Sequence, residues 1–457
     1  MAARNLQRIA ATASAVLALA GCSFMPHYER PAAPVAAAFE TPGEATASTP
    51  ASALAWRDFI PDERTRALVD MALRENRDLR VALLNVEQAR AALGLQNADR
   101  LPTVGVGASG TRTSVSSSYT AGLVLSSFEI DLFGRVRSLS AAAAARLLAT
   151  DEARSSVRLS LIAAVASAEL ALRADDDLLA VTDQVLAGRV EALRLVRLRF
   201  DGGLSGEPEY RAAESLVAAA RASRLALQRQ RAQNLNALVL LLGQPLPAQL
   251  PPARPLAEHR LAALPAGLPS DVLLQRPDVR AAEQQLIAAN ANIGAARAAF
   301  FPRISLTGSV GTASTHLGDL FQNTAWSFAP QLLQPLFDAG RNQANLEAAQ
   351  AGRDIAVAQY EKAIQTAFRE VADGLAGRAT LAAQREAQEA QAAAETRRLA
   401  LADLLLKNGA ASALDRLDAE RAVLAARQAV VQLQLAERQN ALLLYRVLGG
   451  GALLAEP

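Results

Sequence analysis

The chain of 457 residues is 20% charged and only 4% aromatic. Ala, Leu, Arg, Gln and Glu dominate it, a composition typical of long helices that pack through small residues. Its 47 basic and 45 acidic residues give a formal net charge of +2. This balance excludes the basic surface that a nucleic-acid-binding protein needs, so no nucleic acid is expected among its partners.

The N-terminus is predicted to be an export signal. Residues 1–21 combine two arginines with a short uncharged stretch, which ends in Leu19-Ala-Gly-Cys22. These four residues resemble a bacterial lipobox, in which the cysteine is acylated; the alternative is an ordinary small-residue cleavage site. Cys22 is the single cysteine and has no disulfide partner, so we predict that it carries a covalent lipid. In the sorting pattern that accompanies a lipobox, Ser23 favours the outer membrane.

The mature chain is expected to begin with a lipidated tether over residues 22–61, because Pro, Ala and Thr are frequent there. Helical signals begin near Asp62 and end at Pro102. The period of the apolar residues then changes from helical to two, which predicts a β-hairpin over 103–131 and another over 303–335.

Both hairpins lack charge along most of their length. No charged residue occurs between Arg112 and Glu129 or between Asp319 and Asp338. In a chain that is 20% charged, such gaps favour strands buried in lipid; the alternative is a pair of hairpins packed on helices. No mature segment has 18 or more apolar residues in succession, so strands are the expected spanning elements. Leu306 is assigned to the lipid face, and the lumen face receives small residues: Gly105, Gly107, Ser109, Ser305 and Thr307.

The chain is predicted to be a tandem duplication. Pro102 recurs as Pro302 at a spacing of 200 residues, and Gly134 recurs as Gly340 at a spacing of 206. Each copy is expected to contain a helix, a hairpin, a helix about 100 Å long and a final helix. The predicted domains are a signal peptide (1–21), a lipidated tether (22–61), a first repeat (62–243, with helices 135–200 and 208–242), a proline-rich linker (244–271), a second repeat (272–449, with helices 340–406 and 412–447) and a C-terminal tail (450–457).

Four strands cannot span a membrane alone, because lipid does not tolerate the unpaired backbone groups of a sheet edge. A closed barrel needs at least about eight strands. Two chains would give eight strands and three would give twelve. The small residues assigned to the lumen suit the wider barrel.

Several stretches resemble TolC-type outer-membrane efflux proteins, and most of all their lipoprotein branch, which serves RND-type pumps. They are Leu274-Gln-Arg-Pro-Asp-Val-Arg, Phe301-Pro-Arg-Ile-Ser-Leu, Phe128-Glu-Ile-Asp-Leu-Phe-Gly-Arg and Leu414-Asp-Arg-Leu-Asp-Ala-Glu-Arg. The resemblance covers nearly all of the mature chain. It implies a mainly α fold with a transmembrane β part, in which repeats of long antiparallel helices form a periplasmic α-barrel. A homotrimer would then close a twelve-stranded β-barrel.

The function implied by this resemblance is a passive, gated channel in the outer membrane of a Gram-negative bacterium, lipid-anchored and extending into the periplasm. It would carry drugs or other small molecules received from an inner-membrane RND-type pump through a periplasmic adaptor. Two alternatives remain open. A type I secretion duct for polypeptides has the same fold, whereas a non-conducting coiled-coil spacer would not need two charge-free hairpins.

The resemblance places a periplasmic gate just after Gly409, at Leu414, Asp415 and Asp418. The two aspartates share a helix face, so three copies would bring six carboxylates toward one axis. A tyrosine and an arginine that tether the gate in non-lipidated members correspond here to Leu406 and Ala411, so neither side chain is present.

The alternative to the gate is a solvated helix face, with Asp418 paired to Arg421 and Arg416 to Glu420. The corresponding turn of the first repeat offers secondary gate candidates at Glu207 and Glu209.

Enzymatic activity is not expected, and neither is a metal or a cofactor beyond the lipid on Cys22. His27, His259 and His316 lie in unrelated segments without ligand spacing, which suggests surface or loop residues. No lysine lies in a Gly-rich phosphate loop, so any transport must be driven by another protein.

Overall fold

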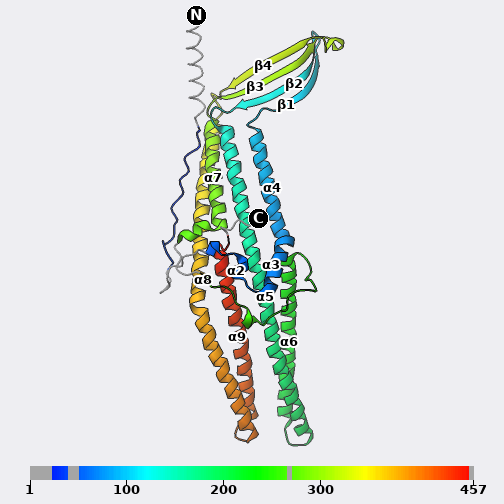
Figure 1. The fold of residues 1–457 in the computed structure, drawn as a ribbon, viewed down its shortest axis with the longest axis vertical. Helices are drawn as coiled ribbons and strands as arrows, with labels where there is room; N and C mark the ends of the chain where they lie inside the picture. Colours follow the sequence, from blue (N-terminus) through cyan, green and yellow to red (C-terminus); the bar gives the residue numbers. More distant parts are fainter. Residues whose placement is uncertain (1–22, 40–50, 265–269, 452–457) are drawn as a thin grey trace. The chain divides into compact units, whose positions relative to one another are not determined.

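The computed structural model describes residues 23–39, 51–264 and 270–451. These residues form two compact units, of which unit 1 holds residues 23–34, 82–154 and 278–364 and unit 2 holds the rest. The elements labelled in Figure 1 are, in chain order, η1 (Ala51–Ala53), α2 (Trp56–Phe59), α3 (Glu63–Glu75), α4 (Arg77–Ala98), β1 (Val104–Arg112), β2 (Ser117–Ile130), α5 (Arg135–Asp201), α6 (Glu207–Leu242), η2 (Leu256–Glu258), η3 (Ser270–Gln275), α7 (Pro277–Ala298), β3 (Arg303–Ser314), η4 (Leu317–Asp319), β4 (Thr324–Leu333), α8 (Arg341–Lys407) and α9 (Ala413–Val447).

The four strands of unit 1 form one antiparallel sheet in the order β1-β2-β3-β4 (Figure 1). The two predicted hairpins are therefore confirmed, and β2 of the first repeat pairs directly with β3 of the second. This pairing joins the repeats and leaves β1 and β4 at the edges of the sheet.

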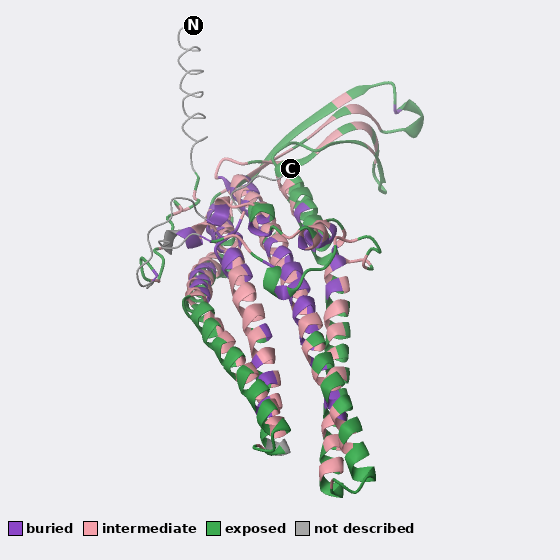
Figure 2. Ribbon diagram, turned by 60° about the horizontal axis from the view of Figure 1, so that its bottom comes forward, coloured by how far each residue is buried: buried purple, intermediate pink, exposed green. Residues whose placement is uncertain are grey.

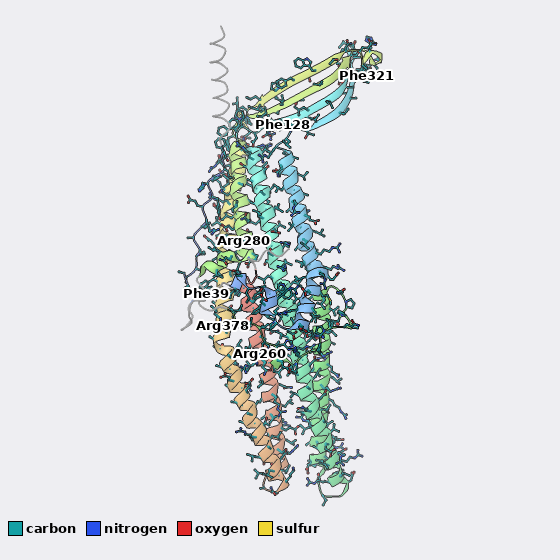
Figure 3. The ribbon with its side chains drawn as sticks, viewed as in Figure 1. Phe39, Phe128, Arg260, Arg280, Phe321 and Arg378 are labelled. Carbon is teal, nitrogen blue, oxygen red and sulfur yellow. The ribbon has the colours of Figure 1, made fainter. Side chains whose placement is uncertain are left out.

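The two faces of the sheet differ in side-chain size and polarity. On one face Ser109 lies opposite Thr120, with their hydroxyl oxygens 2.8 Å apart, and Ser309 lies opposite Ser327, with the oxygens 2.7 Å apart. The other face exposes large apolar side chains, those of Val106, Leu123, Val310, Trp326 and Phe328. Phe128 and Phe321, which is also exposed, lie at opposite ends of the sheet (Figure 3).

A bulge in β2 keeps this division of faces intact down to the end of the strand. The register shifts between Leu125 and Phe128, and Ser127 has a positive φ of 42°. After the shift Phe128 lies opposite Leu306, and Glu129 lies opposite Ser305. Because side chains alternate along a strand, the extra residue reverses the alternation and sends Glu129 to the small-residue face.

In unit 2 the long helices form two helical hairpins, α5 with α6 and α8 with α9 (Figure 1). The helices α5 and α8 have 67 residues each, and the helices that follow have 36 and 35. Gly203 and Gly409 occupy the same place in the two turns, both with φ of +73°, a conformation that favours glycine. The duplication predicted from the sequence is thus present residue by residue.

Burial changes along these hairpins. Buried residues gather toward the ends far from the turns, whereas the segments next to the turns are largely exposed (Figure 2). The turns therefore have little core of their own, and contacts between particular side chains decide how they are held.

The first predicted helix is in fact two helices, α3 and α4, which meet at Asn76. The side chain of Asn76 accepts a hydrogen bond from the backbone N–H of Leu79 at 2.9 Å and donates one to the carbonyl of Leu241 at 2.8 Å. An asparagine whose side chain bonds to the backbone of a nearby residue favours a break in a helix.

Residues 51–60 pack in unit 2, so the predicted tether ends before them. Trp56 and Phe59 are buried, and the Phe59 ring stacks on Tyr445 with centroids 4.3 Å apart. The linker is also anchored where it is described, because Arg438 on α9 donates hydrogen bonds to the carbonyls of His259 and Ala257. His259 lies in a loop as expected, but it is buried.

One helix, α5, includes an 18-residue window with a mean hydropathy of 1.4, apolar and long enough to cross a membrane. Of this window 44% is buried inside the protein, which is equally typical of a core helix.

Candidate functional site

The predicted gate lies at the turn between α8 and α9. Ser412 is the N-cap of α9, so all three gate residues belong to the first two turns of that helix. The backbone of Leu414 is part of α9, but its side chain lies outside the described part of the chain.

Asp415 completes a capping box with Ser412. The Asp415 carboxylate accepts hydrogen bonds from the Ser412 hydroxyl at 2.7 Å and from its backbone N–H at 3.0 Å. The backbone N–H of Asp415 in turn donates to the Ser412 hydroxyl at 3.2 Å. These bonds hold the pKa of the Asp415 carboxyl below its ordinary value. The sequence Ser-Ala-Leu-Asp, from Ser412 to Asp415, by itself predicts this capping box. The gate prediction did not give Asp415 this role.

Asp418 is the aspartate with an exposed carboxylate free of capping. Its nearest cation is Arg421, at 3.5 Å, while Arg416 lies 3.4 Å from Glu420. Both pairs expected of a solvated helix face are therefore present. They leave Asp418 more than half exposed, as a gate carboxylate would also be.

In the first turn the two secondary candidates also have local partners. Glu207 lies 3.2 Å from Arg211, one turn along α6. Glu209 accepts a hydrogen bond from the Ser205 hydroxyl at 2.8 Å. Both carboxylates therefore help to form the start of α6.

Sequence reasoning missed the buried contact that joins the two hairpins. Arg189 on α5 donates from Nε to Glu420 on α9 at 2.9 Å and from Nη1 to the carbonyl of Leu216 on α6 at 3.2 Å. Arg416 lies between Glu420 and Asp403 and forms ion pairs with both. Arg189 and Glu420 are 231 residues apart in the sequence, so no local pattern could have revealed the pair.

The lipidation candidate Cys22 lies outside the described residues, but the segment that follows it contacts unit 1. The ring of Phe24 stacks on Phe301 with centroids 4.4 Å apart. Asn290 on α7 donates a hydrogen bond to the carbonyl of Pro26 at 2.8 Å. A Cβ at Gly294 would lie 2.8 Å from the Cα of Met25, so α7 needs a glycine where the segment crosses it.

A carboxylate on α7 holds the same segment further along. Glu283 accepts a hydrogen bond from the Tyr28 hydroxyl at 2.9 Å and two from the Arg30 guanidinium, at 2.7 and 3.1 Å. Burial, followed by the bond to Glu283, raises the pKa of Tyr28. Residues 24–30 are therefore docked on α7, whereas the sequence predicted a poorly ordered tether.

Both the sequence and the structure of the chain are similar to those of known outer-membrane proteins. The family described as "Outer membrane efflux protein" matches residues 68–244 and 268–450. The chain is 45% identical over 456 residues to the solvent efflux pump outer membrane protein SrpC of Pseudomonas putida, covering 96% of this chain and 97% of that protein. It is 44% identical over 451 residues to the outer membrane protein OprJ of Pseudomonas aeruginosa, covering 95% of this chain and 94% of that protein.

The chain is also similar to solved structures of outer-membrane channels. The open state of the MtrE outer membrane channel of Neisseria gonorrhoeae superposes with a TM-score of 0.87 at 41% identity, covering 94% of this chain and 99% of that one. The Campylobacter jejuni CmeC outer membrane channel gives a TM-score of 0.87 at 26% identity, covering 95% and 96%.

Proposed function

This chain belongs to the outer membrane efflux protein family and is an outer-membrane efflux channel, and from that premise we propose that three copies assemble into one lipid-anchored, gated duct. The observation that carries the assembly is the sheet. It has one face of exposed large apolar residues and one of small and hydroxyl-bearing residues. The first suits lipid and the second suits a water-filled lumen.

The strand order supports closure by association. The edges of the sheet are β1 and β4, and a membrane-spanning sheet with free edges is not stable in lipid. Pairing of β4 with β1 of the next copy would remove every edge, and three copies would give a barrel of twelve strands. The small side chains that face the lumen would leave a channel open along its axis.

The anchor in this proposal is a covalent lipid on Cys22. The sequence Leu19-Ala-Gly-Cys22 supports it, and the docked residues 24–30 would then hold the chain directly after the lipid on α7. A single acyl chain binds membranes only marginally. A barrel together with a lipid would hold the protein firmly.

We infer the partners and substrates of this chain from the names of its relatives. SrpC is named as part of a solvent efflux pump, and other relatives of Pseudomonas putida are named for toluene and for antibiotics. We assign this chain to small, largely apolar molecules, delivered by an inner-membrane RND-type pump through a periplasmic adaptor. The chain itself is then a passive duct.

The gate in this proposal is formed by Leu414 and Asp418 around the three-fold axis, with Asp415 fixing the start of α9 that carries them. The exposed carboxylate of Asp418 supports its role around the axis. The capping box supports the role of Asp415 in fixing the start of α9.

The function can be tested in a bacterial strain from which the gene for this chain has been deleted. Complementation with this chain should restore tolerance to toluene and to several antibiotics, whereas the strain with an empty vector should remain sensitive. If complementation instead restored export of a protein and changed no tolerance, the duct would belong to a type I secretion system.

A further inference from the structure

The two hairpins of one copy are joined along α5 and α9 by two polar contacts, which we name the inner seam. Arg189 and Glu420 form the contact near the turns, at 2.9 Å. Farther from the turns, Gln439 on α9 donates a hydrogen bond to the Ser167 hydroxyl on α5 at 3.0 Å.

The duplication predicts a second seam. Because α5 and α8 have the same length and their turns match, each residue of the first hairpin has a counterpart 206 positions later. In the trimer of the proposed function, on which this inference rests, six hairpins would alternate around a ring. The inner seam between α5 and α9 would then alternate with an outer seam, between α8 of one copy and α6 of the next.

Exposure in the single chain marks the faces of this outer seam. The counterparts of Ser167 and Gln439 are Asp373 on α8 and Gln233 on α6, and both are exposed. Leu225 on α6 is 61% exposed, whereas its counterpart Val431 on α9 is 8% exposed. The helix α9 has α5 beside it, and the same face of α6 has no such neighbour among the described residues.

We propose that the neighbouring copy covers this face and that the outer seam is bonded far from the turns but lacks a bond near them. Far from the turns, Asp373 would accept a hydrogen bond from the amide of Gln233 of the neighbouring copy. Near the turns, the counterparts of Arg189 and Glu420 are Glu395 on α8 and Glu214 on α6. Two carboxylates therefore meet where the inner seam has an ion pair.

The arginines beside these carboxylates already have partners. Arg398 lies 2.6 Å from Glu395, and Arg211 lies 2.8 Å from Glu214, each on the same helix as its glutamate. Each pair satisfies a charge locally and adds no bond across the outer seam. The tip of the duct accordingly separates more easily at the three outer seams than at the three inner seams, which the ion pair of Arg189 and Glu420 holds.

Cross-linking tests where the copies meet. In the double variant Asp373→Cys with Gln233→Cys, a short bismaleimide should join copies into dimers and trimers on a denaturing gel. The matched control, Ser167→Cys with Gln439→Cys, should be linked within one chain and keep the mass of a monomer. If the first variant yields no adduct between copies while light scattering shows a trimer, the outer seam is wrong and the proposed function stands. A monomer without channel activity would instead overturn the proposed function.

A charge reversal tests whether the outer seam lacks a bond near the turns. Glu395→Arg repeats the inner-seam arginine in the second hairpin and should bind Glu214 of the neighbouring copy. The fraction of time that single channels stay open should fall about fivefold, the change expected from one exposed ion pair. Adding Glu214→Ala should restore the wild-type value.

The control for this reversal is Glu386→Arg, which makes the same charge change at an exposed position about two and a half turns earlier on α8, and so on the opposite side of the helix. It should leave the open fraction unchanged. An unchanged or increased open fraction in Glu395→Arg, or a decrease that Glu214→Ala does not reverse, would overturn the proposal.

Discussion

The carboxylate of Glu129, at the end of β2, lies 2.9 Å from Nε of Arg303, at the start of β3, and 2.7 Å from Nη2 of Arg135, at the start of α5. One side chain thus ties β2 and β3 to α5, the helix that follows β2. The bulge at Ser127 makes this possible, because it turns Glu129 away from the apolar face.

Replacing Glu129 by Gln should destabilise this junction by about 1–3 kcal/mol, since two arginines lose a charged partner. The measurement is thermal unfolding of the purified protein in detergent. Arg112→Gln, at the far end of β1, serves as the control and should melt like the wild type. Equal melting temperatures for all three proteins would contradict a role for Glu129 in the junction.

The two faces of the sheet should respond differently to a charge. Leu306→Asp places a carboxylate on the apolar face and should impair insertion, at less than the roughly 2–4 kcal/mol that Lys or Arg costs at the bilayer midplane. Thr307→Asp, one residue along, should insert normally because it faces the lumen. The amount of folded protein in outer-membrane fractions measures both, and equal yields would remove the assignment of faces.

Removal of the proposed gate should make the channel leak. The triple variant Leu414→Ala, Asp415→Ala and Asp418→Ala should conduct more than the wild type in planar bilayers and lose part of its cation preference. Asp418→Ala alone should reproduce most of the lost preference. Unchanged resting conductance and selectivity in the triple variant would move the gate to the first turn, near Glu207 and Glu209.

Asp415 should act through the helix instead. Asp415→Asn should speed amide exchange in the first turn of α9, because the capping box is lost. The folded-state pKa of Asp415 is depressed, so its stabilising effect is present above the ordinary carboxyl pKa and disappears as the pH falls through the depressed value. Exchange protection that does not decrease on acidification would show that the carboxylate does not form the cap.

The docked N-terminal segment can be displaced without touching its own residues. Gly294→Ala puts a methyl group 2.7 Å from the Ser138 hydroxyl oxygen and 2.8 Å from the Cα of Met25, so the Ser138 side chain and the segment must both shift. Chymotrypsin should then cleave after Tyr28 at least several times faster than in the wild type. Gly188→Ala, where a Cβ meets nothing within 4 Å, is the control. Combined with Cys22→Ser, which should block acylation and processing as judged by mass spectrometry, the variant separates lipid from docking.

Local patterns in the sequence predicted the elements well where they depend on neighbours in the chain. Pro102 and Pro302 end helices as expected, and the alternation around Leu306 and Thr307 placed these two residues on opposite faces, as the sheet does. The break at Asn76 and the cap at Ser412 are also local and could have been read from residue type.

Other features depend on contacts between distant segments. The pair formed by Arg189 and Glu420 requires the hairpins to lie side by side, and the docking of residues 24–30 requires a groove at Gly294. The bulge at Ser127 follows from the register with β3, which hydrophobic alternation along β2 alone does not determine.

The fusion of two repeats in one chain also bears on evolution. A ring of six identical single-repeat subunits would have six identical contacts, so any substitution that loosened one would loosen all. Joining the subunits in pairs lowers the symmetry from six-fold to three-fold. Alternate contacts can then evolve separately, and Arg189 and Glu395 have diverged to opposite charge at equivalent positions of α5 and α8. In the proposed trimer, duplication would therefore let selection change three contacts while conserving the other three.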